Sequence, residues 1–255
     1  MEIQDLSWKV NLNKRNNHKS LPRSIRGLIV GKSGCGKTTL MMNLLLNKGW
    51  LDYDNLLVFG KSLFQPEYKM LKECLQRNID KADIMKVFQS QNVFEGKISA
   101  TEILDEYAKM RVKPKKKKKI DCAFFESADD VPDPRELDSE RKNLIIFDDL
   151  QLERQNKCES YYVRGRHSNV DCFYLAQNYF KLPRQTIRDN SNFIILFKQD
   201  AKNINHIYND HASFDWDLQE FRKFCNNAWE KKNGFVVIDL SSAYSSGKFR
   251  TCLDN

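Results

Sequence analysis

The segment Gly31 to Thr38, GKSGCGKT, fits the pattern G-x-x-x-x-G-K-[ST] without a mismatch. The apolar run Gly27 to Val30 precedes it, and apolar residues at helical spacing follow it from Thr39 to Leu46. A strand that turns through glycines into a helix is the setting in which this pattern forms a phosphate-binding loop, or P-loop. A glycine-rich turn could match the pattern by chance, but the strand and the helix on either side argue against that alternative.

The chemistry of this loop predicts nucleotide binding. Glycines let the backbone fold around a phosphate chain with its N–H groups pointing inward, and the positive end of the following helix faces the same anion. Lys37 would then contact the β- and γ-phosphates of ATP, and the Thr38 hydroxyl would hold Mg²⁺. The residues expected to contact ATP are Gly31, Lys32, Ser33, Gly34, Cys35, Gly36, Lys37, Thr38 and Thr39.

Length and composition limit the class of protein. The 255 residues could form one domain or two, and we favour an N-terminal extension over 1–20 followed by one domain over 21–255. No apolar run approaches the roughly 20 residues that cross a bilayer, and the N-terminus lacks the layout of a signal peptide. We therefore expect a protein of the cell interior or the virion, not secreted and without membrane contact. The seven cysteines form no C-x-x-C pair, which argues against a zinc site and a disulfide framework.

A second apolar strand, expected at 55–60, completes a strand–helix–strand unit. The sheet should therefore be mainly parallel, with helices on both faces. The fold class predicted is α/β, a P-loop NTPase with a RecA-like sheet. Other strands are expected at 143–147, 170–175, 192–197 and 234–240, with possible ones at 6–10 and 248–253. Helices are expected at 66–76, 85–94, 100–110, 182–190, 200–209 and 215–232.

Residues 111–140 interrupt this alternation. A run of five lysines gives way to an acidic stretch that contains proline, so we expect a loop or a disordered insertion. The run could be a solvated charge block, a DNA-contacting loop or a nuclear-import signal. The net charge of +8 favours polyanions, but the acidic stretch could neutralise the lysines beside it. The candidate DNA-contacting residues are Lys115, Lys116, Lys117, Lys118 and Lys119.

Two carboxylates, Asp148 and Asp149, end the apolar strand expected at 143–147. An acid at the carboxyl end of a buried parallel strand emerges beside the P-loop, where Mg²⁺ needs an oxygen partner. We assign Asp148 to Mg²⁺, through water, and Asp149 to orienting or deprotonating the attacking water. Either acid could instead only cap the strand. Gln177 closes the next strand and is the candidate for contact with the γ-phosphate or the attacking water, unless it is a surface amide.

Together with the P-loop and the double aspartate, the segment GRHSNVDCFYLAQNYFKLPRQTIRDNSNFIILF carries a family resemblance. Residues 20–240 resemble the genome-packaging ATPases of the FtsK–HerA superfamily, most nearly those of poxvirus-type large DNA viruses, virophages and polinton-type elements. The resemblance implies ATP bound between the protomers of a ring, with Asp148, Asp149 and Gln177 around it. It also implies that Arg188 acts across a subunit boundary. Arg184, Arg164 and Arg166 are the next candidates for that last role. Two features depart from the family: the second acid is aspartate where cellular members usually have glutamate, and the insertion at 111–140 has no counterpart.

The function implied by the resemblance is a motor that hydrolyses ATP with Mg²⁺ and moves double-stranded DNA into a viral capsid. Its partners would be double-stranded DNA, further copies of the chain in a ring, as a hexamer or a pentamer, and capsid or portal proteins. Two other functions are compatible with a P-loop. One is a nucleotide or nucleoside kinase, in which Arg184 and Arg188 would belong to a lid, and the other is a nucleotide-gated assembly protein with little turnover.

Overall fold

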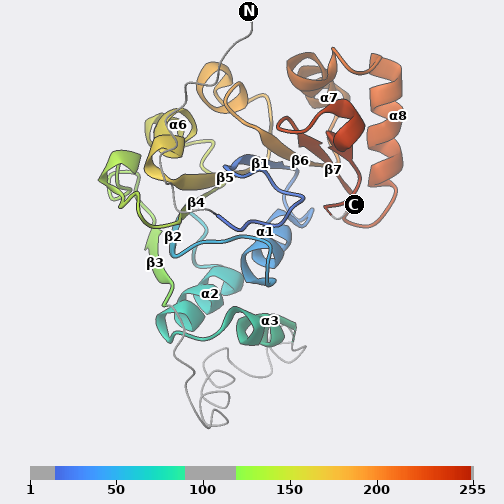
Figure 1. The fold of residues 1–255 in the computed structure, drawn as a ribbon. Coiled ribbons are helices and arrows are strands. Elements are labelled where there is room, and N and C mark those ends of the chain that lie inside the picture. Colours follow the sequence, from blue (N-terminus) through green and yellow to red (C-terminus); the bar gives the residue numbers. More distant parts are fainter. Residues whose placement is uncertain (1–14, 90–118, 254–255) are drawn as a thin grey trace, which may run out of the picture.

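The computed structural model describes residues 15–89 and 119–253, which form an 8-stranded sheet with helices on both faces (Figure 1). The strand order is β3-β2-β4-β5-β1-β6-β7-β8. Neighbouring strands are parallel from β3 to β6, whereas β7 is antiparallel to both β6 and β8. The strands are β1 (Arg26–Val30), β2 (Asn55–Gly60), β3 (Asp121–Phe125), β4 (Asn143–Asp148), β5 (Val170–Ala176), β6 (Phe193–Phe197), β7 (Phe235–Asp239) and β8 (Phe249–Arg250). The α/β class and the mainly parallel sheet are confirmed.

The sheet separates two apolar cores, because successive side chains of a strand point to opposite faces. Ile29 packs in the core beneath α1, α2 and α3, while its neighbour Leu28 packs in the core beneath α6, α7 and α8. Every residue of β4 and β5 is buried, which explains the apolar runs Leu144 to Phe147 and Cys172 to Ala176 within them. The helices are α1 (Lys37–Leu46), α2 (Pro66–Gln76), α3 (Lys81–Gln89), α6 (Asn156–Arg164), α7 (Ala201–Ile207) and α8 (Leu218–Trp229).

The pairing register places the carboxyl ends of the central strands at one edge of the sheet. Val30, the last residue of β1, is paired with Ala176, the last residue of β5. Asp148, the last residue of β4, is paired with Leu175 of β5 and with Gly60 of β2. The P-loop, the double aspartate and the β5 end therefore emerge side by side, as expected for the ligand-binding edge of a parallel sheet.

The expected loop at 111–140 contains regular structure, so this prediction was wrong in part. Residues Asp121–Phe125 form β3, which pairs in parallel with β2 at the edge of the sheet. A single helical turn at Pro134–Glu136 follows, capped by Asp133 and Glu136. Four of the five residues of β3 are apolar, but the strand is short, half-buried and closely follows the lysine run, so the charged composition of the segment outweighed it.

Several other boundaries also differ. Helix α3 starts at Lys81 instead of residue 85, and α8 starts at Leu218, after the Asp217 cap. The segment Arg184–Arg188 is a single π-helical turn within the short helix expected at 182–190. The strand expected near the C-terminus is β7, and the possible edge strand is β8. The strand expected at 6–10 and the helix expected at 100–110 lie outside the described residues.

Part of the expected N-terminal extension packs onto the domain. The Arg15 guanidinium forms a buried ion pair with Asp171 at 3.1 Å and donates to the carbonyl oxygens of Asn143 and Asn169. The backbone N–H of Asn16 donates to Asp52 at 2.8 Å. Residues 15 and 16 therefore pack against the amino ends of the central strands, at the opposite end of the strands from the P-loop. The division at residue 20 stays a prediction.

Cys74, Cys158, Cys172 and Cys225 are buried thiols outside any disulfide, and Cys35 and Cys122 are half-buried thiols outside any disulfide. Among the described residues, no helix is long and apolar enough to cross a membrane.

Candidate active site

The loop between β1 and α1 has the backbone conformation that its glycines permit. Gly34 has φ 75° and Gly36 has φ 104°, both in the left-handed region that L side chains rarely adopt. Gly31 is required for a different reason, because a Cβ there would lie 2.5 Å from Cys35 Sγ and 2.7 Å from Phe197 Cβ. Helix α1 begins at Lys37, directly after Gly36, so its first N–H groups face the loop.

The Lys37 side chain is buried within the loop. Its ammonium group donates to the carbonyl oxygen of Gly31 at 2.6 Å and to that of Lys32 at 3.1 Å. A buried ammonium favours any anionic oxygen that enters beside it, because a charged acceptor makes the stronger hydrogen bond. This placement matches the phosphate-contacting role predicted for Lys37.

Asp148 ends β4 beneath the P-loop and is buried. Burial raises the pKa of the Asp148 carboxyl above its usual range, while a hydrogen bond from Tyr68 opposes that rise. The Tyr68 hydroxyl donates to Asp148 Oδ2 at 2.6 Å. Tyr68 belongs to α2, and nothing in the sequence pattern around Asp148 pointed to this partner.

Asp149 and Gln177 meet across the ends of β4 and β5. The Gln177 side-chain nitrogen donates to Asp149 Oδ2 at 2.5 Å. Asp149 has φ 53°, which is uncommon for a residue other than glycine and is concentrated at functional sites. A hydrogen bond from the Asp149 N–H to the Leu175 carbonyl oxygen, at 3.0 Å, holds this conformation. The pairing turns the Asp149 carboxylate toward the β5 end.

One cavity of about 260 Å³ brings these groups together. It joins six of the nine residues predicted to contact ATP to both aspartates and Gln177, whereas Gly31, Lys32 and Cys35 do not line it. A further wall comes from the β2–α2 connection, which was not expected from the sequence. The sequence nevertheless contained enough to predict this wall. Strand β2 ends at Gly60 and Pro66 starts a helix soon after it, so the connection between them lies at the carboxyl end of the sheet, as the P-loop does. The cavity is lined by Ser33, Gly34, Gly36, Lys37, Thr38, Thr39, Ser62, Gln65, Glu67, Asp148, Asp149 and Gln177.

The oxygen atoms in this cavity suit Mg²⁺ carried in on a nucleotide. Mg²⁺ prefers oxygen ligands and commonly keeps several waters and substrate phosphates beside one or two protein groups. The Thr38 hydroxyl and the Asp148 carboxylate supply such groups, and both line the cavity. Within the described residues, no group of three or more His, Cys, Asp or Glu side chains is placed to hold a metal ion.

Arg188 differs from the expectation. Its side chain is 7% exposed, and its guanidinium pairs with the buried Asp210 carboxylate at 2.9 Å and lies 5.0 Å from the Tyr179 ring centroid. The expectation that Arg188 acts across a subunit boundary does not fit this burial, because a side chain with that role must extend beyond its own subunit. Arg184, on the same turn, is 66% exposed. Arg164 and Arg166 are exposed as well.

The lysine run cannot be placed as a unit. Lys115, Lys116, Lys117 and Lys118 lie outside the described residues, whereas Lys119 is described and exposed just before β3. Its contact with DNA stays a prediction.

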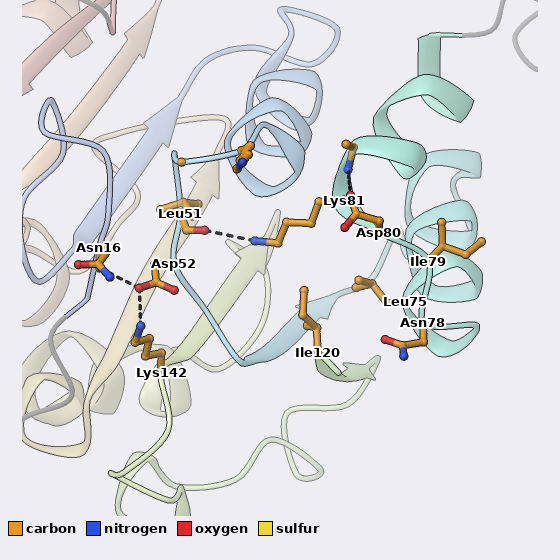
Figure 2. A pocket seen from close by; sticks show the side chains of 13 residues that line it. Asn16, Leu51, Asp52, Leu75, Asn78, Ile79, Asp80, Lys81, Ile120 and Lys142 are labelled. Atoms are coloured by element: carbon orange, nitrogen blue, oxygen red, sulfur yellow. Dashed lines mark hydrogen bonds and ion pairs between the residues drawn. The ribbon is translucent and has the colours of Figure 1, made fainter. Parts of the chain in front are cut away.

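The larger cavity in Figure 2, of about 680 Å³, is not this site. It lies at the amino ends of β2, β3 and β4, because Asp52, Ile120 and Lys142 precede those strands. In Figure 2, Asn16 and Lys142 both approach Asp52, and Lys81 points toward the Leu51 carbonyl oxygen, to which it donates at 3.2 Å. None of the residues predicted to bind ATP lines it.

A family model matches the part of the chain that contains Asp148, Asp149 and Gln177. The family model described as "Poxvirus A32 protein" matches residues 115–255. A search of curated protein sequences finds no match.

Two solved structures of the genome packaging NTPase B204 from Sulfolobus turreted icosahedral virus 2 share the fold. The complex with AMP is 11% identical, has a TM-score of 0.51, and the match covers 90% of this chain and 97% of that chain. The complex with ATP-gammaS is 9% identical, with a TM-score of 0.51 and the same coverage of 90% and 97%. At these identities the likeness is one of fold.

Proposed function

The chain belongs to the poxvirus A32 protein family, and on this basis we propose that it is an ATP-hydrolysing motor that translocates double-stranded DNA during viral genome packaging. The resemblance to poxvirus-type packaging ATPases is thereby confirmed at the level of the family. The observation that carries the proposed hydrolysis is the single cavity in which Lys37 and Thr38 face Asp148, Asp149 and Gln177.

The reaction transfers the γ-phosphoryl group of ATP to water. The water oxygen forms a bond to the γ-phosphorus, the bond from that phosphorus to the β–γ bridging oxygen breaks, and Asp149 accepts the proton that the water loses. The Gln177 amide holds the Asp149 carboxylate through the 2.5 Å hydrogen bond. Lys37 places its positive charge beside the phosphates, where charge changes during the reaction.

Thr38 and Asp148 would hold Mg²⁺, which supplies positive charge to the β- and γ-phosphate oxygens when it is bound. The Thr38 hydroxyl follows Lys37 at the start of α1, and Asp148 is at the end of β4, so both groups come from rigid elements. The B204 complexes with AMP and ATP-gammaS support the choice of an adenine nucleotide for the cavity.

The proposed partners follow from packaging. A packaging motor acts on double-stranded DNA, and the net charge of +8 favours such a polyanion. Arrangement in a ring, whether hexamer or pentamer, and docking on capsid or portal proteins, inside the infected cell or on the virion, are parts of the same proposal.

The deciding experiment measures ATP hydrolysis with Mg²⁺, with and without double-stranded DNA. We expect release of orthophosphate that requires Mg²⁺ and is stimulated by DNA. Labelled γ-phosphate that appears on a nucleoside monophosphate would instead identify a kinase. Nucleotide binding without turnover would identify an assembly protein gated by nucleotide.

A further inference from the structure

Tyr68 connects α2 to the carboxyl end of β4. Its side chain is 1% exposed and lies in the core formed with Ile29, Leu56 and Val58. The hydroxyl donates to Asp148 Oδ2 at 2.6 Å, across 80 positions of sequence. A buried hydroxyl in the core needs a hydrogen-bond partner. The partner of the Tyr68 hydroxyl is a carboxylate that lines the nucleotide cavity.

The surrounding backbone holds this contact in place. Glu67, the residue before Tyr68, lines the nucleotide cavity together with Thr38 and Asp148. The end of β2 also packs against Asp148, because a Cβ on Gly60 would lie 3.3 Å from the Asp148 carbonyl oxygen and 3.4 Å from its Cβ. Asp148 is therefore enclosed by β2 and α2 as well as by its own strand.

A carboxylate at the end of a strand can rotate about its side-chain bonds unless a neighbour holds it. Because Tyr68 donates to Oδ2, it limits this rotation and fixes the direction in which the second oxygen, Oδ1, points. We propose that Tyr68 is a positioning residue for Mg²⁺, whose hydroxyl orients the Asp148 carboxylate toward the nucleotide-bound metal. This inference rests on the proposed function, since it assumes that Asp148 acts on Mg²⁺.

A matched control exists in the same core. Tyr53 is 4% exposed, and its hydroxyl donates to the Leu45 carbonyl oxygen at 3.1 Å, away from the nucleotide cavity. Tyr53→Phe therefore removes a buried hydroxyl and its hydrogen bond without touching Asp148. Comparing it with Tyr68→Phe separates the loss of a core hydrogen bond from the loss of metal positioning.

The test measures the affinity for ATPγS twice, in excess Mg²⁺ and in EDTA, for the full chain and each variant. Partners that orient metal ligands typically contribute about 10- to 100-fold to metal affinity or activity. The ratio of the affinity in Mg²⁺ to the affinity in EDTA measures how much the metal tightens binding. We expect this ratio to be about 10-fold smaller in Tyr68→Phe than in the wild-type protein, with the affinity in EDTA unchanged. Tyr53→Phe should keep the wild-type ratio of the two affinities. Thermal unfolding of each variant confirms that it is folded.

Three results would overturn the proposal. The first is a wild-type ratio in Tyr68→Phe, and the second is an equal loss of affinity in Mg²⁺ and in EDTA, which would mark a structural role. The third is a full Tyr68→Phe effect in an Asp148→Asn background, because the effect must pass through that carboxylate. If instead Mg²⁺ does not tighten ATPγS binding to the wild-type protein, the proposed function itself fails.

Discussion

Gln177 donates a hydrogen bond to Asp149 Oδ2 at 2.5 Å, and so joins the end of β5 to the end of β4 within the nucleotide cavity. This contact orients the carboxylate proposed to accept a proton from water. It also separates the two acids, because Asp148 is instead held by Tyr68. The two neighbouring aspartates therefore have different partners, and substitutions of the two should have different effects on nucleotide binding and cleavage.

Asp149→Asn should keep ATP and Mg²⁺ bound but stall cleavage, because the amide cannot accept the proton. Asp148→Asn should instead weaken the Mg²⁺-dependent part of nucleotide binding. Nucleotide affinity with and without Mg²⁺, and single-turnover cleavage, measure the two effects. Equal loss of nucleotide binding in both variants would show that the division of roles is wrong.

Glu67→Gln is the comparison variant for the proton acceptor, since Glu67 is a third carboxylate that lines the cavity. We expect it to cleave ATP far faster than Asp149→Asn. The reverse order of the two rates would assign the proton to Glu67, which is one methylene longer than an aspartate.

Lys37→Ala should nearly abolish hydrolysis while the fold survives. The substitution removes the buried ammonium from beside the phosphates, and losses of such electrostatic groups are on the order of 10²-fold or more. Steady-state ATPase rates and the thermal unfolding midpoint provide the two readouts. Turnover within a few-fold of wild type would exclude Lys37 from the mechanism.

Replacing Lys115 to Lys119 with serine should flatten the salt dependence of DNA binding. Each phosphate neutralised contributes about −0.9 to the slope of log affinity against log salt concentration. The control removes the same charge from five exposed lysines elsewhere, namely Lys19, Lys69, Lys223, Lys231 and Lys232. If the run contacts DNA, its replacement should reduce the slope more than the control does. Equal slopes in both variants would assign the run to solvation or nuclear import.

Arg188→Ala should destabilise the fold. Removing one partner of a buried ion pair typically costs about 3 kcal/mol or more. Here Asp210 would lose its buried partner at 2.9 Å and keep the longer pair with the exposed Arg184 at 3.7 Å and the hydrogen bond from Tyr179 at 2.9 Å. The exposed Arg184, on the same turn, is the matched control and should change the free energy of unfolding by less than about 0.5 kcal/mol when replaced with Ala. Denaturant unfolding measures both. Equal effects would contradict the structural role of Arg188.

The parts of the site that the sequence predicted are those encoded by neighbouring residues. The P-loop is a continuous motif with its strand and helix attached, and Asp148 and Asp149 follow directly on a buried apolar run. Gln177 could be placed because parallel strands end at a common edge, and that rule holds in the register of β4 with β5.

The features that the sequence did not predict depend on contacts between distant segments of the chain. Tyr68 meets Asp148 across 80 positions, so no local pattern could pair them. The family resemblance places Arg188 at a subunit boundary, whereas Asp210, 22 positions away, holds its side chain inside the protomer. The strand β3 is short and half-buried, and it follows a lysine run, so its place in the sheet depends on its pairing with β2 and not on a local pattern.

The burial of Arg188 changes the prediction for an arginine acting between subunits. Such a residue must be exposed in its own protomer so that it can approach the phosphates of the next one. Arg184 is 66% exposed and lies within 3.9 Å of Asp189 and 3.7 Å of Asp210, pairs that an exposed side chain can exchange at little cost. We therefore expect Arg184 to act across the subunit boundary. Arg164 and Arg166 are the other exposed candidates.

Mixing two inactive variants tests this expectation. An arginine supplied across an interface contributes about 10³- to 10⁵-fold in rate in the GTPase case, so Arg184→Ala alone should be nearly inactive. Combined with Lys37→Ala in confirmed mixed oligomers, it should regain part of the ATPase activity, because some interfaces then join an intact P-loop to an intact arginine. When Arg188→Ala replaces Arg184→Ala in the mixture with Lys37→Ala, the ATPase activity regained should be limited by the fraction of the Arg188→Ala protein that is folded. If Arg184→Ala is active alone, or if mixing restores nothing, then Arg184 does not act in trans, and the same mixture made with Arg164→Ala or Arg166→Ala identifies the residue that does.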